Sequence, residues 1–194
     1  LMLLNFTNFL TWLLTTLTFI FYGFIYTKYL KYMTSQNIVI GGLAGAMPPL
    51  LGWSAITNTI EPNALLLVLI IMVWTPPHFW ALAVYRVEDY SEAEVPMLPV
   101  QKGVAFTKQH ILLYTFLLIA CTMLPYAVQM FGEIYLISAL IISKVRKTFC
   151  IHFLICSGKK KYYATYFFLL HSSTPNQNPK IICELVLNYA FSLI

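Results

Sequence analysis

Long uncharged stretches and short polar segments alternate along the chain. Apolar runs without charge cover residues 1–27, 38–60, 64–84 and about 110–130, and another run begins near Glu133. A helix needs about 20 apolar residues to cross a bilayer. The pattern therefore predicts an all-α protein, a polytopic transmembrane helix bundle with five spans.

The alternation weakens after Ser143, where basic clusters interrupt the apolar runs. The runs at 149–156 and 162–170 are each too short to cross a bilayer alone, and the last apolar stretch covers 181–194. We expect a sixth span in this tail, which gives five to six spans in all. The chain is thus divided into a transmembrane domain, residues 1–143, and a basic and apolar tail, residues 144–194, whose lysines suit anionic lipid.

Glycines and prolines distinguish the second run from the others. Gly41 and Gly45 have the small-xxx-small spacing that lets membrane helices approach closely, and Pro48 and Pro49 predict a kink. A phosphate-binding glycine loop is disfavoured, because no strand precedes these glycines and no Lys-Ser/Thr pair follows them. The second run is expected to be a closely packed, kinked helix.

The positions of the cations predict how the spans are oriented. Lys and Arg gather after the first, third and fifth runs, and the turns at 58–62 and 131–133 contain none. Short cytoplasmic loops carry the excess of Lys and Arg in membrane proteins. The basic loops are therefore expected on the cytoplasmic side, at Lys28 and Lys31, at Arg86, Lys102 and Lys108, and at Lys144, Arg146 and Lys147.

Composition supports a membrane protein and excludes other classes. Apolar residues make up 59% of the chain and charged residues 10%, which excludes an ordinary soluble domain and a disordered chain. The net charge of +5 comes from short clusters that form no continuous basic face, so nucleic-acid binding is not expected. The four cysteines have no metal-ligand spacing and are expected to be reduced.

The third run leads into an acidic segment. Four of the seven acidic residues lie between Glu88 and Glu94. They could form a solvated loop paired with Arg86 and Lys102, or supply one or two carboxylates to a Mg²⁺ ion that also binds a diphosphate. If one helix continues into this segment, a single face carries His78, Leu82, Tyr85 and Asp89. Pro76 and Pro77 would kink that helix.

Two residues in these regions each have two interpretations. His78 could face a ligand, or be a buried histidine bonded to a neighbouring helix. Lys28, with Lys31 three residues later, could hold a diphosphate as point charges or simply flank a membrane surface. An acidic loop and a basic loop on one side of an apolar bundle together favour a lipid diphosphate as the substrate.

Two long stretches carry a specific family resemblance. Residues 26–53 read YTKYLKYMTSQNIVIGGLAGAMPPLLGW, and residues 74–103 read WTPPHFWALAVYRVEDYSEAEVPMLPVQKG. Both closely resemble the protoheme IX farnesyltransferases, or haem O synthases, and the likeness covers about residues 5–143. These proteins are intramembrane polyprenyltransferases, all-α proteins of about nine spans with two Asp-rich cytoplasmic loops that bind magnesium and an isoprenoid diphosphate.

The resemblance implies transfer of a farnesyl group from farnesyl diphosphate to the 2-vinyl group of haem B, which gives haem O. It implies that Asp89 and Arg86 are catalytic, and that Asp89, with Glu88, binds Mg²⁺. His78 would lie near the porphyrin, either contacting the iron or shaping the pocket. The implied substrate-binding residues are Lys28, Lys31, Asn37, His78, Tyr85 and Lys102.

The resemblance also implies a setting. A bacterial inner (plasma) membrane is expected, with the motif loops cytoplasmic, because no Arg-rich transit segment is present. Membrane lipid is an expected partner, and association with haem A synthase or oxidase assembly is a further expectation.

The sequence departs from the family pattern in two places. The first Asp-rich loop has no counterpart, and the chain starts at Leu1, so we expect a fragment that lacks its front and is inactive alone. Glu94 stands where many members have a small residue before PMLP. Two alternatives stay open: prenylation of a quinone-type aromatic ring, which WTPPHFW and PMLP disfavour, and a non-catalytic membrane remnant.

Overall fold

The computed structural model describes residues 2–155, and the expected sixth span lies outside them. Every regular element within these residues is helical. The elements are α1 (Met2–Phe6), α2 (Phe9–Ile20), η1 (Phe21–Leu30), α3 (Lys31–Met33), α4 (Asn37–Gly45), α5 (Pro48–Thr57), α6 (Pro62–Tyr85), α7 (Val87–Glu92), α8 (Leu98–Lys102), α9 (Val104–Ala127) and α10 (Glu133–Ile155).

Four helical stretches in the described residues are long and apolar enough to cross a membrane. They are Phe9–Met33, Asn37–Thr57, Pro62–Tyr85 and Val104–Ala127, and they match the first four apolar runs of the sequence. The predicted all-α membrane bundle is therefore confirmed.

The expected fifth span forms a helix but differs from the other four. α10 runs from Glu133 to Ile155, yet every stretch of 18 residues within it contains Lys144, Arg146 and Lys147. These cations exclude it from the helices that are apolar enough to cross. α10 also continues without interruption through residues 143 and 144, where the sequence predicts the start of the tail.

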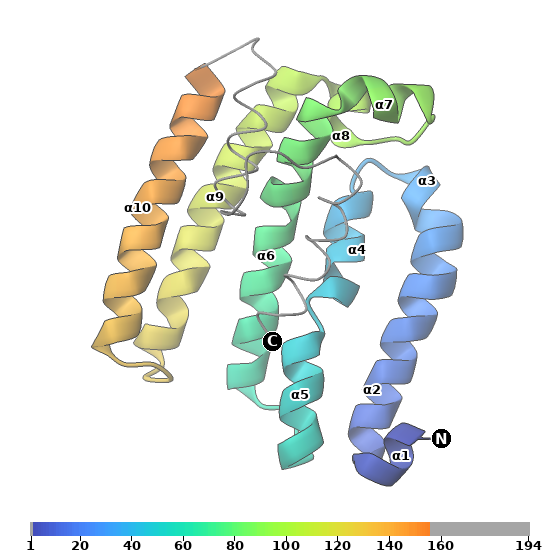
Figure 1. The fold of residues 1–194 in the computed structure, drawn as a ribbon, viewed down its shortest axis with the longest axis vertical. Coiled ribbons are helices and arrows are strands. Elements are labelled where there is room, and N and C mark those ends of the chain that lie inside the picture. The colour runs from blue at the N-terminus through green and yellow to red at the C-terminus, as the bar shows by residue number, and fades with distance from the viewer. Residues whose placement is uncertain (1, 156–194) are drawn as a thin grey trace, which may run out of the picture.

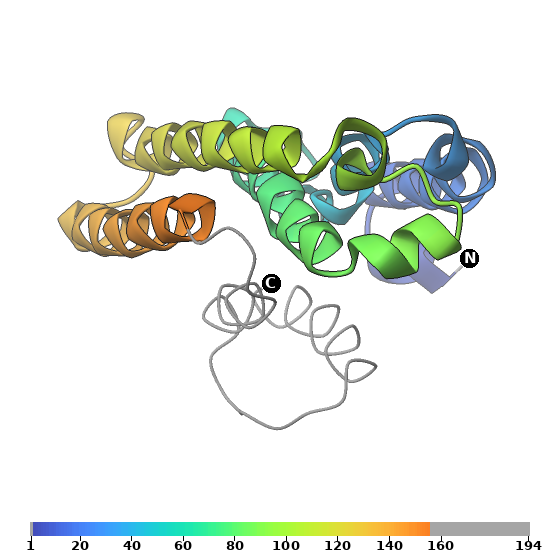
Figure 2. The same ribbon diagram turned by 90° about the horizontal axis from the view of Figure 1, so that it is seen from above.

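The long helices stand side by side, with α6 in the middle of the bundle (Figure 1). α6 packs against α4 and α5 on one side and against α9 on the other, and α10 packs against the outside of α9. The first span packs against α4 and α5. α7 and α8 lie at one end of the bundle, where they connect α6 to α9 (Figure 1). Seen from above, α9 and α10 lie at one side of the bundle and the first span lies at the other (Figure 2).

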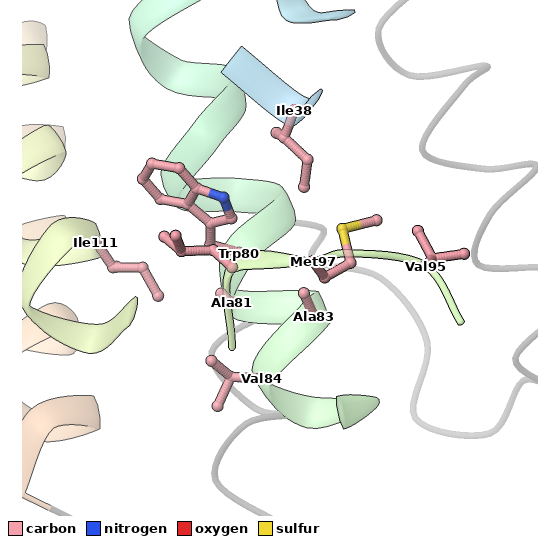
Figure 3. Packing of buried hydrophobic residues seen from close by; sticks show 9 residues of the cluster. Ile38, Trp80, Ala81, Ala83, Val84, Val95, Met97 and Ile111 are labelled. Carbon is pink, nitrogen blue, oxygen red and sulfur yellow. The ribbon is translucent and has the colours of Figure 1, made fainter. Parts of the chain in front are cut away.

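The largest buried cluster lies near that same end. Trp80 on α6 has no exposed surface, and it packs between Ile38 of α4 and Ile111 of α9 (Figure 3). Val95 and Met97, from the connection between α7 and α8, belong to the same cluster. The acidic segment is thus tied to the bundle by apolar residues at its end.

The glycines of the second span pack differently from the prediction. A side chain at Gly42 would meet Thr75 of α6 at 3.0 Å, and one at Gly41 would meet the ring of Tyr26 of η1. Gly45 has nothing within 4 Å of such a position. Close packing is confirmed, but it involves the neighbouring Gly41 and Gly42, which face two different helices, and Gly45 takes no part in it.

The kink in the second span is a break between two helices. α4 ends at Gly45, and α5 begins at Pro48 with both prolines in its first turn, where a missing N–H costs no helical hydrogen bond. Pro76 and Pro77 behave differently, because α6 stays helical through both of them.

Polar side chains join the first and second spans at the end far from α7. Thr11 is buried on α2, and its hydroxyl shares a hydrogen bond of 2.9 Å with the buried hydroxyl of Ser54 on α5. The Asn8 side-chain amide donates to the Ser54 carbonyl and accepts from the Thr11 N–H. In lipid such hydrogen bonds replace the hydrophobic effect as a force between helices.

Candidate functional site

The helix that carries His78 stops before the acidic residues. α6 ends at Tyr85, and Arg86, with φ −110° and ψ 33°, leaves the helical conformation before α7 begins at Val87. The prediction that one continuous helix places His78, Leu82, Tyr85 and Asp89 on a shared face is therefore wrong. His78 is 2% exposed, whereas Tyr85 is 39% exposed.

α7 presents its carboxylates to the solvent. Glu88 and Asp89 lie in the first turn of α7, where the helix dipole favours negative charge, and both are exposed together with Glu92. Tyr90 turns the other way and packs against the cluster around Trp80. The acidic helix is therefore amphipathic, with one face on the bundle and one face open to a ligand.

Asp89 forms an ion pair with Arg86. The guanidinium Nη1 lies 3.7 Å from the carboxylate Oδ2, and the Asp89 side chain is 67% exposed. An exposed pair of this kind contributes about 0.2–1 kcal/mol. The pairing of the acidic segment with Arg86 is thus confirmed, and the ion pair is weak enough for a ligand to replace it.

α7 ends in a cap in which Glu94 has a left-handed backbone conformation. Its φ is +53°, the Glu94 N–H donates to the Ser91 carbonyl, and the Val95 N–H donates to the Tyr90 carbonyl, each at 3.2 Å. This is a Schellman cap, in which the left-handed position favours glycine. Glycine adopts this position without strain, whereas Glu94 adopts it at a cost.

α3, which begins with Lys31 and directly follows the end of η1 that carries Lys28, lies at the same end of the bundle as α7 (Figure 1). The Lys28 ammonium lies 5.7 Å from the centre of the Tyr29 ring, and that of Lys31 lies 5.4 Å from the centre of the Tyr32 ring. Lys28 belongs to the π-helical segment η1, whereas Lys31 begins α3. From the sequence, their spacing of three residues predicts that the two lysines project from one face of an α-helix, but the helix type changes between them, so that prediction does not apply.

Asn37 is buried rather than open to a ligand. It has no exposed surface, and its side-chain N–H donates to the Lys31 carbonyl at 3.0 Å. Its Oδ1 is buried and has no hydrogen-bond partner. The structure therefore connects Asn37 to the backbone of the predicted diphosphate-binding loop.

His78 lies inside an aromatic cluster. Its ring stacks on Trp74 with the centroids 4.5 Å apart, and it meets Phe79 edge-on at 5.3 Å. Of the other predicted residues, Lys102 is exposed at the end of α8 and Tyr85 at the end of α6. Asp89, Glu88, Arg86 and Tyr85 are neighbours in the sequence and are wholly or partly exposed, whereas His78 is buried.

One cation that the sequence did not single out for the site is buried. Lys108 on α9 is only 6% exposed, next to the fully buried Thr107. The sequence shows Lys108 merely as part of a basic loop, and nothing in that pattern distinguishes it from the exposed Lys102. Whether a lysine is buried depends on how α9 packs against its neighbours, and the charge pattern of the loop does not reveal that packing.

The side chains of the described part of the chain fit a metal only together with a ligand. Within residues 2–155, no group of three or more His, Cys, Asp or Glu side chains could hold a metal ion. Mg²⁺ is commonly bound through one or two carboxylates and the oxygens of a phosphate substrate. Asp89 and Glu88, both exposed on α7, are suited to that second kind of site.

Comparisons with known proteins agree with the fold and the sequence motifs. The model of the UbiA prenyltransferase family matches residues 1–172. A protoheme IX farnesyltransferase of Legionella pneumophila (strain Lens) is 62% identical over 141 residues, which are 73% of this chain and 48% of that protein. A protoheme IX farnesyltransferase of Saccharophagus degradans is 60% identical over 140 residues, 72% of this chain and 46% of that protein.

A third relative, protoheme IX farnesyltransferase 1 of Pseudomonas putida, is 58% identical over 139 residues, 72% of this chain and 47% of that protein. The chain thus spans about half the length of the curated relatives it matches. No solved structure matches the chain.

Proposed function

The chain belongs to the UbiA prenyltransferase family, and on that basis we propose that it acts in transfer of a farnesyl group from farnesyl diphosphate to the 2-vinyl group of haem B, giving haem O. The observation that carries this proposal is the exposed Asp89 carboxylate on α7, at the same end of the bundle as Lys28 and Lys31. Both segments lie within residues that resemble the protoheme IX farnesyltransferases.

In this proposal the charged residues hold the diphosphate. Asp89, with Glu88, would hold Mg²⁺, which would supply positive charge against the negative charge of the departing diphosphate. Arg86 exchanges its ion pair with Asp89 for a diphosphate oxygen, and Lys28, Lys31 and Lys102 add positive charge. A fixed set of charges at the leaving group lowers the barrier without needing to reorganise during the reaction.

The proposed chemistry needs a polar rim and an apolar interior. The C1–O bond of farnesyl diphosphate breaks, and the diphosphate leaves with the bonding electrons. The vinyl carbon of haem B attacks C1, and water then adds to the resulting cation and loses a proton. Apolar packing below the rim, around Trp80, would keep water from the first cation.

His78 has a packing role in this proposal. Its burial and its stacking on Trp74 support a histidine that shapes the pocket for the porphyrin rather than one that contacts the iron. Tyr85, exposed at the end of α6, would line the entrance. Asn37 would act through the Lys31 backbone.

The proposed location follows from the family and from the four apolar helices. The protein is an integral membrane protein, and we propose a bacterial inner membrane with α7 and Lys28 on the cytoplasmic side. Association with haem A synthase or with oxidase assembly would bring the product to its next user.

Ligand binding by this chain tests the site directly. Thermal unfolding of the purified chain in detergent, with farnesyl diphosphate and with or without Mg²⁺, should show stabilisation that needs both ligands. Asp89→Asn should remove it, whereas Glu133→Gln, an equally conservative change at the opposite end of the bundle, should leave it intact. Equal stabilisation of the Asp89→Asn variant and the unaltered chain would remove Asp89 from the site.

Activity is tested in a hybrid protein. The segment of the Legionella pneumophila relative that matches this chain is replaced by the corresponding 141 residues, and haem O is measured in membranes supplied with haem B, farnesyl diphosphate and Mg²⁺. The hybrid should form haem O and its Asp89→Asn variant should not. A hybrid that prenylates a quinone-type ring instead would contradict the proposed acceptor.

A further inference from the structure

Two exposed lysines interrupt the apolar surface of α10. The uncharged part of this helix ends at Ser143, and Lys144 and Lys147 follow on the next turn, both exposed. The uncharged residues 134–143 rise about 15 Å at 1.5 Å per residue. That is roughly half of the 30 Å that the hydrocarbon core of a bilayer requires.

The contacts of α10 with α9 fix the depth of these lysines. The Tyr135 hydroxyl donates a hydrogen bond of 3.0 Å to the Thr122 carbonyl, near the end of α9. One turn from the middle of α10, the Lys147 ammonium lies 5.7 Å from the centre of the Phe116 ring, halfway along α9. The basic turn therefore lies beside the apolar part of a membrane-spanning helix and not beyond its end.

The two lysine side chains lean toward one end of α10. Helical side chains lean toward the N-terminus of their helix. In α10 the N-terminus is Glu133, at the far end from α7, so the two side chains lean away from the end that holds α7 (Figure 1). A short apolar stretch is accommodated when the bilayer becomes thinner beside it, and that thinning would bring lipid phosphates down to the cations.

The surface around the two lysines is apolar. Ile137, Leu140 and Ile141 of α10 are exposed, and so are Leu113 and Leu117 of α9. A cationic turn above an exposed apolar surface matches a phosphate attached to acyl chains. A zwitterionic headgroup carries its own cation, whereas an anionic headgroup leaves a charge that the lysines can neutralise.

We propose that Lys144 and Lys147 bind the phosphate of an anionic phospholipid whose acyl chains lie along the exposed surface of α9 and α10. The site is separate from α7 and from the residues that the proposed function uses. Phe116 contributes its ring face to the Lys147 ammonium. The bound lipid would seal the edge of the bundle where α10 is too charged to contact hydrocarbon directly.

Lipid-dependent stability tests this proposal. The purified chain is unfolded thermally in detergent with added dioleoylphosphatidylglycerol or dioleoylphosphatidylcholine. Phosphatidylglycerol should raise the melting temperature, and phosphatidylcholine should not. In the double variant Lys144→Gln/Lys147→Gln, the apparent affinity for phosphatidylglycerol should fall about 30-fold, because each lysine contributes about a factor of five near an anionic surface.

Two further variants distinguish binding at Lys144 and Lys147 from a general effect of positive charge. Lys28→Gln/Lys31→Gln removes two lysines with the same spacing and should keep the response to phosphatidylglycerol. Lys144→Arg/Lys147→Arg keeps the charge and should also respond. Equal loss in the Lys28 and Lys144 double variants, or equal stabilisation by soluble glycerol 3-phosphate, would overturn the proposal. A wild-type chain that ignores phosphatidylglycerol would overturn it too, in favour of a carboxylate on a neighbouring membrane helix.

Discussion

The side-chain amide of Asn37 donates a hydrogen bond to the backbone carbonyl of Lys31, and so ties the start of α4 to the end of the first span. Asn37 is fully buried, so water cannot replace its side-chain N–H as the partner of this carbonyl. The connection lies in the turn that carries one of the proposed diphosphate-binding cations.

Asn37→Asp should destabilise the chain, because a carboxylate keeps the size of the amide but loses its N–H donor. A buried carbonyl that loses its partner costs about 1–3 kcal/mol. Thermal unfolding in detergent measures the effect, and the exposed neighbour supplies the control, since Gln36→Glu should change the melting temperature little. A fully stable Asn37→Asp variant would show that the hydrogen bond contributes nothing.

Glu94→Gly should stabilise the chain. Glu94 occupies the left-handed position of the Schellman cap with φ +53°, a conformation that costs a residue with a side chain roughly 1–2 kcal/mol and costs glycine little. Part of this gain is lost to the greater freedom of glycine in the unfolded chain, so we expect about 0.5–1 kcal/mol.

The control for Glu94 lies two residues earlier. Glu92→Gly removes the same side chain from the last residue of α7, which is not among the positive-φ positions, and should destabilise by about 0.5–1 kcal/mol. Changes of the same sign in both variants would indicate an effect of charge rather than of backbone conformation.

Gly42→Val should destabilise the contact between α4 and α6, because the new side chain would meet Thr75 at 3.0 Å. Overpacking of this kind costs about 1–3 kcal/mol. Gly45→Val introduces the same residue in the same helix where nothing lies within 4 Å, and it should be nearly neutral. Similar melting temperatures for the two variants would contradict the finding that a side chain would meet α6 at Gly42 but nothing at Gly45.

The hydrogen bond between Thr11 and Ser54 should contribute measurable coupling between the first and second spans. In a double-mutant cycle with Thr11→Val and Ser54→Ala, we expect about 0.6 kcal/mol of interaction energy, the average for hydrogen bonds between membrane helices. Unfolding free energies of the four proteins give this value. If the two single-mutant changes in unfolding free energy simply add, the hydrogen bond between the two hydroxyls contributes no net stability.

Arg86→Gln should change ligand binding more than stability. The ion pair with Asp89 is solvent-exposed, so its loss should cost less than about 1 kcal/mol of unfolding free energy. In the proposed function, however, the guanidinium contacts the diphosphate, and stabilisation by farnesyl diphosphate with Mg²⁺ should decrease. Undiminished stabilisation would assign Arg86 only to its ion pair.

The sequence predicted the spans correctly where length and hydrophobicity alone decide the outcome. Four apolar runs of about 20 residues became four membrane-spanning helices, and Pro48 and Pro49 marked the break between α4 and α5. The prediction failed where helix direction depends on neighbours. The choice of Gly42 over Gly45 is set by the position of Thr75 on another helix.

The candidate site was predicted less completely than the fold. The ion pair of Arg86 with the acidic segment could be predicted from charge. The break between α6 and α7 at Arg86 could not, because no proline or glycine marks it in the sequence. The π-helical turns of η1 likewise lack any such marker, and they change how Lys28 and Lys31 are arranged. A shared face predicted from α-helical spacing fails wherever the helix type changes.

The cluster around Trp80 contains residues from α4, α6 and α9 as well as Val95 and Met97, which follow the acidic helix. α7 is consequently anchored at both ends, by α6 before it and by this apolar packing after it. A substitution that alters the volume at the indole, without touching any charged group, should therefore displace the carboxylates at the rim. The position of the acidic helix is thus decided by the volume of uncharged side chains one layer beneath it.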